Sequence, residues 1–251
     1  MAKQIAMGWT TSYYFQQEWN QLHQTIPHRS QIKIKKVICP NATNLQLHGF
    51  CDSSERAYGA CLYIRSTDVN KKTYSEMLCS TSKVALLKQL TIPRFELCAA
   101  ILLSKLYKKA IHALNLTVNE SYLWTDSSIV LTWIQGPPNK WKAFVGNRVD
   151  LIQEQTAAAT WRHVPSQSHP AEFISMGIEP TTLSTSTLCW KGQQWLTQEP
   201  SSGLISEVNT STDNLEARKV HVASLQAPDD IPFRFSKLTD SSGSLCTAED
   251  S

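Results

Sequence analysis

The chain has 251 residues, a hydrophobic content of 41% and a formal net charge of +3 at pH 7. This length suffices for one sizeable domain with extensions, and so mild a charge permits a nucleic-acid partner without requiring one. The longest apolar run, residues 97–103, is far too short to cross a bilayer, and residues 1–15 lack the apolar run of a signal peptide. We therefore expect an intracellular protein, cytoplasmic or nuclear, that is not secreted and binds no membrane.

Residues 1–40 are polar and aromatic, with a candidate short helix over residues 15–23 and an alternating segment over residues 32–40. Beyond them, three further segments read as strands, which are residues 45–52, 57–66 and 73–83. Because the links between these strands are short, they predict an antiparallel meander.

The hydrophobic period then changes to that of a helix. The longest helix is predicted over residues 91–115, with Thr91 as its candidate cap and Asn115 at its end. The pattern next predicts a strand, two helices, a strand and a short helix, over residues 121–126, 127–136, 140–156, 159–165 and 169–177. The predicted order is therefore β-β-β-α-β-α-α-β-α.

The composition changes after residue 177, where Ser and Thr become abundant. Residues 199–251 contain few aromatic side chains, and we expect this tail to be mostly disordered or loosely docked. The seven cysteines are scattered and no two have the C-x-x-C spacing of a zinc knuckle. They are expected to be free thiols that pack as small apolar side chains.

Four carboxylates occupy comparable places in this pattern. Asp52 and Asp126 end predicted strands, Glu96 lies in the first turns of the long helix, and Glu172 opens the last helix. Functional groups of open sheets collect at strand ends and at the helix starts beside them. Carboxylate oxygens are the ligands that Mg²⁺ prefers, and two ions about 3.5–4 Å apart can clamp both the attacking and the leaving oxygen of a phosphodiester.

Each acid also has a structural interpretation that the sequence leaves open, which for Glu96 is that of a solvated charge on a mostly apolar helix. Asp52 and Asp126 both precede two serines and can be turn or helix-cap residues. Glu172 can be a glutamate that a helix dipole favours. Strand alternation places Asp52 on the face that carries His48 and Phe50, opposite the face of the apolar side chains.

Four blocks closely resemble consecutive blocks of the ribonuclease H region in the polyprotein of BEL/Pao-type LTR retrotransposons. The blocks are LHGFCDSSERAYGACLYIR, LTIPRFELCAAILLSKL, LWTDSSIVLTWI and WRHVPSQSHPAEFISMGIEP. The likeness extends over roughly residues 19–195, and WKGQQWL is similar to the segment that follows the ribonuclease in that family.

The resemblance implies an α/β, ribonuclease H-like fold, which is a five-stranded mixed sheet with helices on both faces. It implies an endonuclease that cuts the RNA strand of RNA–DNA hybrids with two Mg²⁺ ions, for which Mn²⁺ can substitute. By motif, the metal ligands and catalytic acids are Asp52, Glu96, Asp126 and Glu172. The domains are then residues 1–40, an extension that would link to a missing reverse transcriptase; residues 41–180, the ribonuclease H-like domain; and residues 181–251, a Ser/Thr-rich and partly disordered segment.

The last block departs from the family pattern, which reads asparagine-proline-alanine-aspartate and then leucine, leucine or isoleucine, serine, arginine and glycine. Here His169 replaces the asparagine, Glu172 the aspartate and Met176 the arginine. The extra methylene moves the Glu172 carboxylate, and errors of about 1 Å can cost on the order of 100-fold in rate. We therefore expect weakened rather than abolished activity.

Two histidines near the fourth acid, His163 and His169, are candidates for proton transfer to or from the leaving group. Hybrid binding is expected to use shape, 2′-hydroxyl contacts and phosphate neutralisation rather than base reading. The candidate nucleic-acid ligands are Lys140, Trp141, Lys142, Arg148, Lys83 and Lys88. Lys140–Arg148 can equally be a helix with a solvated basic face and a core tryptophan. A reverse transcriptase supplied in trans is a further candidate partner.

Two other functions stay open. A decayed or domesticated transposon copy can persist as a catalytically impaired module that binds nucleic acid or another partner. The same fold also serves 3′-5′ exonucleases and strand-transfer enzymes. The retained Asp52, Glu96 and Asp126 favour the enzyme over the impaired module, and the early strand-end aspartate and the helix glutamate favour ribonuclease H.

Overall fold

The computed structural model describes residues 15–17, 19–21, 23–27, 32, 42–85, 90–114, 116–166, 169–198 and 216–217. All of them belong to one compact unit, Met1–Arg218, while the second unit, Lys219–Ser251, lies outside the described residues. Residues 15–17, 19–21 and 23–25 are helical, in the region where a short helix was predicted. The predicted alternating segment over residues 32–40 lies outside the described residues except for Ile32.

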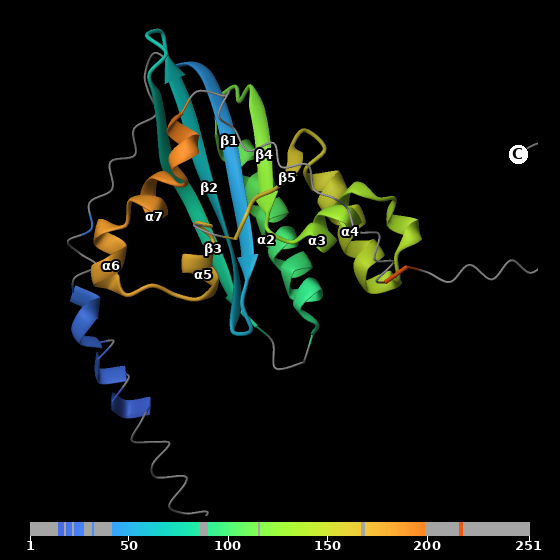
Figure 1. The fold of residues 1–251 in the computed structure, drawn as a ribbon, viewed down its shortest axis with the longest axis horizontal. Coiled ribbons are helices and arrows are strands. Elements are labelled where there is room, and N and C mark those ends of the chain that lie inside the picture. The colour runs from blue at the N-terminus through green and yellow to red at the C-terminus, as the bar shows by residue number, and fades with distance from the viewer. Residues whose placement is uncertain are drawn as a thin grey trace, which may run out of the picture. The chain divides into compact units, whose positions relative to one another are not determined.

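The core of this unit is a five-stranded sheet. Its strands are β1 (Ala42–Ser53), β2 (Ala57–Asp68), β3 (Thr73–Val84), β4 (Glu120–Thr125) and β5 (Thr160–His163), in the order β3-β2-β1-β4-β5 (Figure 1). Strand β2 pairs antiparallel with both β1 and β3, whereas β1–β4 and β4–β5 are parallel pairs. The predicted meander and the mixed sheet are thus confirmed.

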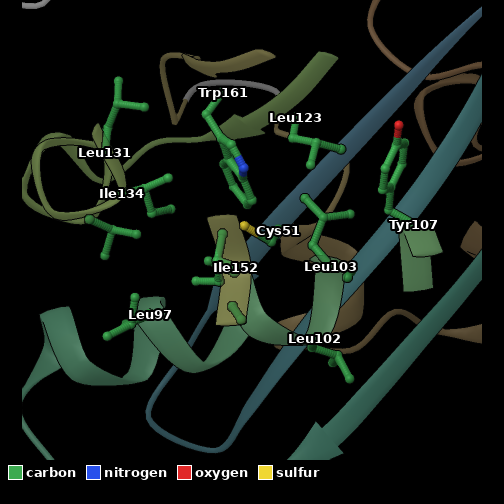
Figure 2. Close-up of a cluster of buried hydrophobic side chains, with 14 of the residues drawn as sticks. Cys51, Leu97, Leu102, Leu103, Tyr107, Leu123, Leu131, Ile134, Ile152 and Trp161 are labelled. Atoms are coloured by element: carbon green, nitrogen blue, oxygen red, sulfur yellow. The ribbon is translucent and has the colours of Figure 1, made fainter. Parts of the chain in front are cut away.

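One face of the sheet is covered by three helices, α2 (Ile92–Ala113), α3 (Ser128–Gln135) and α4 (Ala143–Gln155). Figure 2 shows their apolar side chains packed against sheet residues such as Cys51 and Leu123. Leu103 of α2 and Ile152 of α4 are fully buried there. Removing this apolar area from water is the main term that holds the helices on the sheet.

The opposite face is covered by short helical segments after β5. These are α5 (Glu172–Ser175), α6 (Pro180–Thr185), α7 (Thr187–Lys191) and the 3-10 turn η3 (Gln194–Thr197). Cys189 and Leu196 from this layer pack against Phe50, Tyr63 and Trp124 of the sheet. Helices therefore lie on both faces, as the resemblance implied.

Polar contacts also fasten this second layer. The buried Arg65 donates from Nε to the Leu196 carbonyl (2.8 Å) and from Nη2 to the Gln198 carbonyl (2.9 Å). The Tyr63 hydroxyl donates to the Cys189 carbonyl at 2.8 Å. Residues that were predicted only as a Ser/Thr-rich segment thus share a core with the sheet up to residue 198.

The order of elements from β1 to α5 is confirmed, with ends within a few residues of those predicted. Ser127 caps α3, because its side chain accepts a hydrogen bond from the Val130 amide, whereas the Thr91 side chain makes no capping bond on α2. The three domain limits stay predictions. Apart from Glu216 and Ala217, the expected disorder of residues 199–251 concerns residues outside the described ones.

The cysteines that the structure describes are free thiols, and three of them, Cys51, Cys61 and Cys189, are buried in the core. This agrees with the expectation that they pack as apolar side chains. Among the described helices, none is long and apolar enough to cross a membrane.

Candidate active site

Asp52 and Asp126 are brought together by the register of two parallel strands. In the β1–β4 pair Cys51 lies opposite Thr125, so that the residue following each of them is an aspartate at the same edge of the sheet. Parallel strands place such groups side by side because their carboxyl ends coincide. The Asp52 carboxylate accepts a hydrogen bond from Ser175, which belongs to the layer that covers the Phe50 face of the sheet. Asp52 and Phe50 therefore lie on the same strand face, as predicted.

Glu96 reaches this edge from the second turn of α2. Its carboxylate is hydrogen bonded to the hydroxyl of Ser127, the residue that follows Asp126. The same hydroxyl accepts from the Val130 amide at 3.3 Å and so caps α3. One serine therefore links the helix acid to the start of the helix beyond β4.

Glu172 opens α5, and its position is fixed by the residues before it. The Nδ1 atom of His169 accepts a hydrogen bond from the Ala171 amide (3.2 Å), and the His169 carbonyl accepts from the Glu172 amide (3.1 Å). The imidazole contact thus fixes the turn that leads into α5, whose cap residue, Ala171, has no side-chain capping bond. After one turn α5 ends before Gly177, whose φ of +90° suits a residue without a side chain.

The four carboxylates influence one another electrostatically. Burial raises the pKa of Asp52 to about 6, with the Ser175 hydrogen bond opposing and the Asp126 charge adding to the shift. Burial likewise raises the pKa of Glu96 to about 7, opposed by Ser127 and reinforced by the charges of Asp126 and Asp52. The pKa of Glu172 is raised by burial and by Asp126. Asp126 thus acts on all three of the other acids.

This donor set fits Mg²⁺ by its chemistry. Carboxylate oxygens are hard ligands, and a divalent cation would relieve the repulsion that adds to burial in raising the pKa values of Asp52, Glu96 and Glu172. Among the residues that the structure describes, however, no three Asp, Glu, His or Cys side chains are grouped closely enough to hold an ion. The described acids therefore interact electrostatically at this edge without forming a preformed metal site.

The two histidines differ in their surroundings. His163 ends β5, is half-buried, and lies with Nε2 3.0 Å from the Asp126 carbonyl, so that Nε2 is the protonated nitrogen. His169 is 1% exposed and packs edge-on against Phe50, with ring centroids 5.6 Å apart. Burial lowers the pKa of His169 to about 4, partly offset by Asp126. His163 is thus the more accessible of the two beside Asp126.

The predicted nucleic-acid ligands fall into three groups. Lys140 and Lys142 are exposed at the start of α4, and Arg148 is half-buried with its guanidinium 3.6 Å from the Phe144 ring centroid. Trp141 is 1% exposed and donates from Nε1 to the Trp133 carbonyl, so it is a core residue and cannot stack on a nucleic acid.

The two remaining lysines come before α2 in the chain. Lys83 is exposed near the end of the edge strand β3, and Lys88 lies outside the described residues. Neither position tests the prediction that these side chains contact nucleic acid.

The sequence interpretation overlooked Arg94, although it stands only two residues before Glu96. Its Nε and Nη2 atoms donate to Oε1 of Glu216 at 3.0 and 2.7 Å. Glu216 also receives a hydrogen bond at its carbonyl from the Lys142 amide at 2.8 Å. Ser175, Ser127 and Ser166, which hydrogen bond to the candidate acids, were overlooked as well. The only indication of these serines in the sequence was that they lie in the same sequence blocks as the acids.

Residues 3–127 match the family model of the Pao retrotransposon-like RNaseH-like domain. The match includes Asp52, Glu96 and Asp126 but ends before Glu172. It confirms the resemblance drawn from the sequence blocks, and the five-stranded mixed sheet agrees with it. No curated protein sequence is significantly similar to the chain.

Solved ribonuclease H structures are similar to this chain at low identity. RNase H1 from Halobacterium salinarum NRC-1 is 13% identical with a TM-score of 0.32, over 51% of this chain and 90% of that chain. LC11-RNase H1 in complex with an RNA/DNA hybrid is 14% identical with a TM-score of 0.34, over 56% and 99%. The N-terminal RNase H domain of rv2228c from Mycobacterium tuberculosis is 14% identical with a TM-score of 0.33, over 51% and 88%. These values are too low to transfer residue roles.

Proposed function

We propose that the Pao retrotransposon-like RNaseH-like domain of this chain cleaves the RNA strand of RNA–DNA hybrids as a two-metal endonuclease, using Mg²⁺ or Mn²⁺. The observation that carries the proposal is the set of four carboxylates, Asp52, Glu96, Asp126 and Glu172, which come from separate elements; burial and the charge of Asp126 raise the pKa values of the other three. Such a cluster of like charges is costly unless a cation compensates it. The family match supports the same reaction class.

In this proposal the four acids hold the two divalent ions. When bound, the metal lowers the pKa of the attacking water and stabilises the charge that develops on the departing 3′ oxygen. The chain's own contribution is to keep the carboxylates in place. Ser175, Ser127 and Ser166 hydrogen bond to Asp52, Glu96 and Asp126 and thereby limit their rotation.

We assign proton transfer to the leaving group to His163 rather than to His169. His163 is half-buried and lies beside Asp126, whereas His169 is enclosed and its pKa of about 4 keeps it neutral at pH 7. A neutral, enclosed imidazole cannot supply a proton to a substrate that binds outside the core. The role proposed for His169 is therefore to fix the turn before α5 and to pack against Phe50.

The hybrid is proposed to lie along the basic surface formed by Arg94, Lys140, Lys142 and Arg148. Lys140 and Lys142 are exposed just before α4, and Arg94 lies at the start of α2, two residues from Glu96. Such groups neutralise phosphates without reading bases, which suits a substrate that is recognised by its shape. A reverse transcriptase acting in trans is the proposed source of the hybrid.

One assay tests the proposal. The full chain is incubated with an end-labelled RNA–DNA hybrid in Mg²⁺ or Mn²⁺, beside the Asp126→Asn variant and the Glu154→Gln variant. Glu154 is an exposed acid on α4, so its loss controls for a general change of charge. We expect RNA cleavage by the wild-type and Glu154→Gln proteins and none by Asp126→Asn. Equal cleavage by all three proteins, or by none of them, contradicts the enzyme.

A second candidate function is a catalytically impaired module that binds nucleic acid. Two observations favour it: the longer Glu172 side chain at the fourth position, and the absence of a preformed metal-binding group among the described residues. The same proteins separate the two functions when hybrid binding is measured beside cleavage. Binding that is retained without cleavage in either metal supports the impaired module.

A further inference from the structure

Ser175, the last residue of α5, lies between two of the candidate acids. It is 2% exposed, and its hydroxyl donates to Oδ2 of Asp52. The same oxygen lies 3.2 Å from the carbonyl of Glu172. A hydroxyl has a single proton to donate, and an ionised carboxylate is the stronger acceptor. The hydroxyl therefore serves Asp52, while the residue itself completes the helical turn that Glu172 begins.

Two other contacts hold α5 on the sheet. The Ser54 hydroxyl, in the turn between β1 and β2, donates to the Ser175 carbonyl at 2.7 Å. Ile174 packs over Gly59 of β2 so closely that a Cβ at that position would lie 2.4 Å from its Cγ2 atom. Since α5 is only four residues long, these contacts set its position. They act on the backbone and on Ile174, and neither touches the Asp52 carboxylate.

We propose that Ser175 is a positioning residue for metal binding, because its hydroxyl holds Oδ2 of Asp52 and so sets the orientation in which the carboxylate meets a metal ion. This inference rests on the proposed function for its catalytic meaning. Asp52 is 9% exposed and faces the charge of Asp126, so an unrestrained carboxylate would turn away from its neighbour. Hydrogen-bond partners of metal ligands commonly contribute about 10–100-fold to metal affinity or activity.

Ser175 also couples two acids through one residue. Its side chain sets the orientation of Asp52, and its backbone, held by Ser54, sets the end of the turn that carries Glu172. A shift of α5 would therefore move Glu172 and release Asp52 together. A purely structural serine would instead fasten α5 without any effect on how the acids take up a cation.

The test compares Ser175→Ala with Ser54→Ala in the full chain. Both variants remove a hydrogen bond that holds α5, but only Ser175→Ala removes the partner of Asp52. Mn²⁺ affinity is measured by electron paramagnetic resonance without nucleic acid, and thermal unfolding of each variant is followed by circular dichroism. We expect Ser175→Ala to bind Mn²⁺ about 10–100-fold more weakly and Ser54→Ala to lose clearly less affinity, because the Asp52 hydrogen bond and the packing of Ile174 over Gly59 remain in the Ser54 variant.

The kinetic readout is the split between kcat and KM on the hybrid. Ser175→Ala is expected to lower kcat while KM changes less than about twofold, because the hybrid surface is not altered. Should the alanine variant fail to fold, Ser175→Cys replaces it, because a thiol of similar size is only a weak donor.

Three outcomes overturn the inference. They are equal Mn²⁺ affinity in the Ser175 variant and the wild type, an equal loss of affinity in the Ser54 and Ser175 variants, and no Mn²⁺ binding by the wild type. Failure of the proposed function has a different signature, which is a wild type that does not cleave hybrids although its Mn²⁺ affinity still depends on Ser175.

Discussion

Arg94 directs two donors at a single carboxylate oxygen of Glu216, at 3.0 and 2.7 Å, although the two residues are 122 positions apart in the chain. Lys142 approaches the other oxygen at 3.7 Å, and Trp141 forms an antiparallel bridge with Ala217. The Arg94 side chain is 30% exposed and that of Glu216 is 12% exposed. An acidic side chain thus occupies the basic groups that we propose for phosphate binding.

Glu216→Gln is expected to tighten hybrid binding, because it frees Arg94 and Lys142 from a competing anion. One exposed charge contact is typically worth up to about 1 kcal/mol, which corresponds to a change of about three- to fivefold in Kd. Fluorescence anisotropy with a labelled hybrid at low and moderate salt measures this effect, which should shrink as salt rises.

The matched control for that experiment is Glu154→Gln, which removes the same charge from an exposed position on α4. If both variants bind equally more tightly, net charge alone explains the gain. Weaker binding by Glu216→Gln would mean that Glu216 helps to shape the surface rather than to cover it.

The stability of the metal-free protein is expected to depend on pH through Asp52 and Glu96. Their pKa values rise from 3.8 to about 6 and from 4.5 to about 7 on folding, mainly through burial. The folded state therefore binds protons more tightly than the unfolded chain does. Their stabilising contribution is complete below about pH 4 and is lost as the pH rises through 6 and 7.

Urea unfolding in EDTA at pH 5 and pH 8 measures this dependence. Asp52→Asn should reduce the loss of stability between the two pH values by on the order of 1–2 kcal/mol relative to the wild type. Mg²⁺ added at pH 8 should raise the unfolding free energy of the wild type, because it binds the folded state. Identical pH dependence in both proteins would mean that the burial of Asp52 has little effect.

Glu172→Asp is expected to increase the cleavage rate. The aspartate restores the side chain that the family pattern has at this position, and the shorter reach returns the carboxylate by about 1 Å, a displacement that can cost on the order of 100-fold. Single-turnover kinetics on an RNA–DNA hybrid measure the change, with Glu172→Gln as the variant of equal length and no charge. A slower Glu172→Asp enzyme would show that α5 has adapted to the longer side chain.

Gly59→Ala is expected to displace α5. The added Cβ would lie 2.4 Å from Cγ2 and 2.7 Å from Cβ of Ile174, so that the helix has to move. Overpacking of this kind typically costs about 1–3 kcal/mol, measurable by urea unfolding. The double variant Gly59→Ala/Ile174→Ala removes the Cγ2 clash and should lose less stability than the two single changes summed. Strict additivity would contradict the contact.

Much of the fold could be predicted from sequence because the hydrophobic period changes where the elements change. Strand alternation predicts that Asp52 and Phe50 lie on one face of the sheet. Because Asp52 and Asp126 each end a strand, parallel pairing of β1 with β4 brings the two aspartates side by side. These inferences depend only on local periodicity and on the geometry of paired strands. The candidate acids could therefore be predicted from the sequence alone.

The second helical layer was harder to foresee, because its elements are too short to show a period. Segments such as α7, with five residues, are shorter than two helical turns, so its apolar run of Leu188, Cys189 and Trp190 does not reveal a helical period. Trp141 was ambiguous for another reason. A tryptophan flanked by lysines reads equally as a stacking platform or as a core residue, and only its tertiary partner, Trp133, decides between them.

The Arg65 contacts with Leu196 and Gln198 have a consequence for how the chain can be cut. A proteolytic event or a recombination breakpoint near residue 180 would strip Cys189 and Leu196 from the sheet and expose Phe50 and Tyr63 to water. Processing that leaves the nuclease fold intact must therefore act beyond Gln198. A fragment ended at that residue is the shortest one that keeps every carbonyl to which the buried guanidinium donates among the described residues.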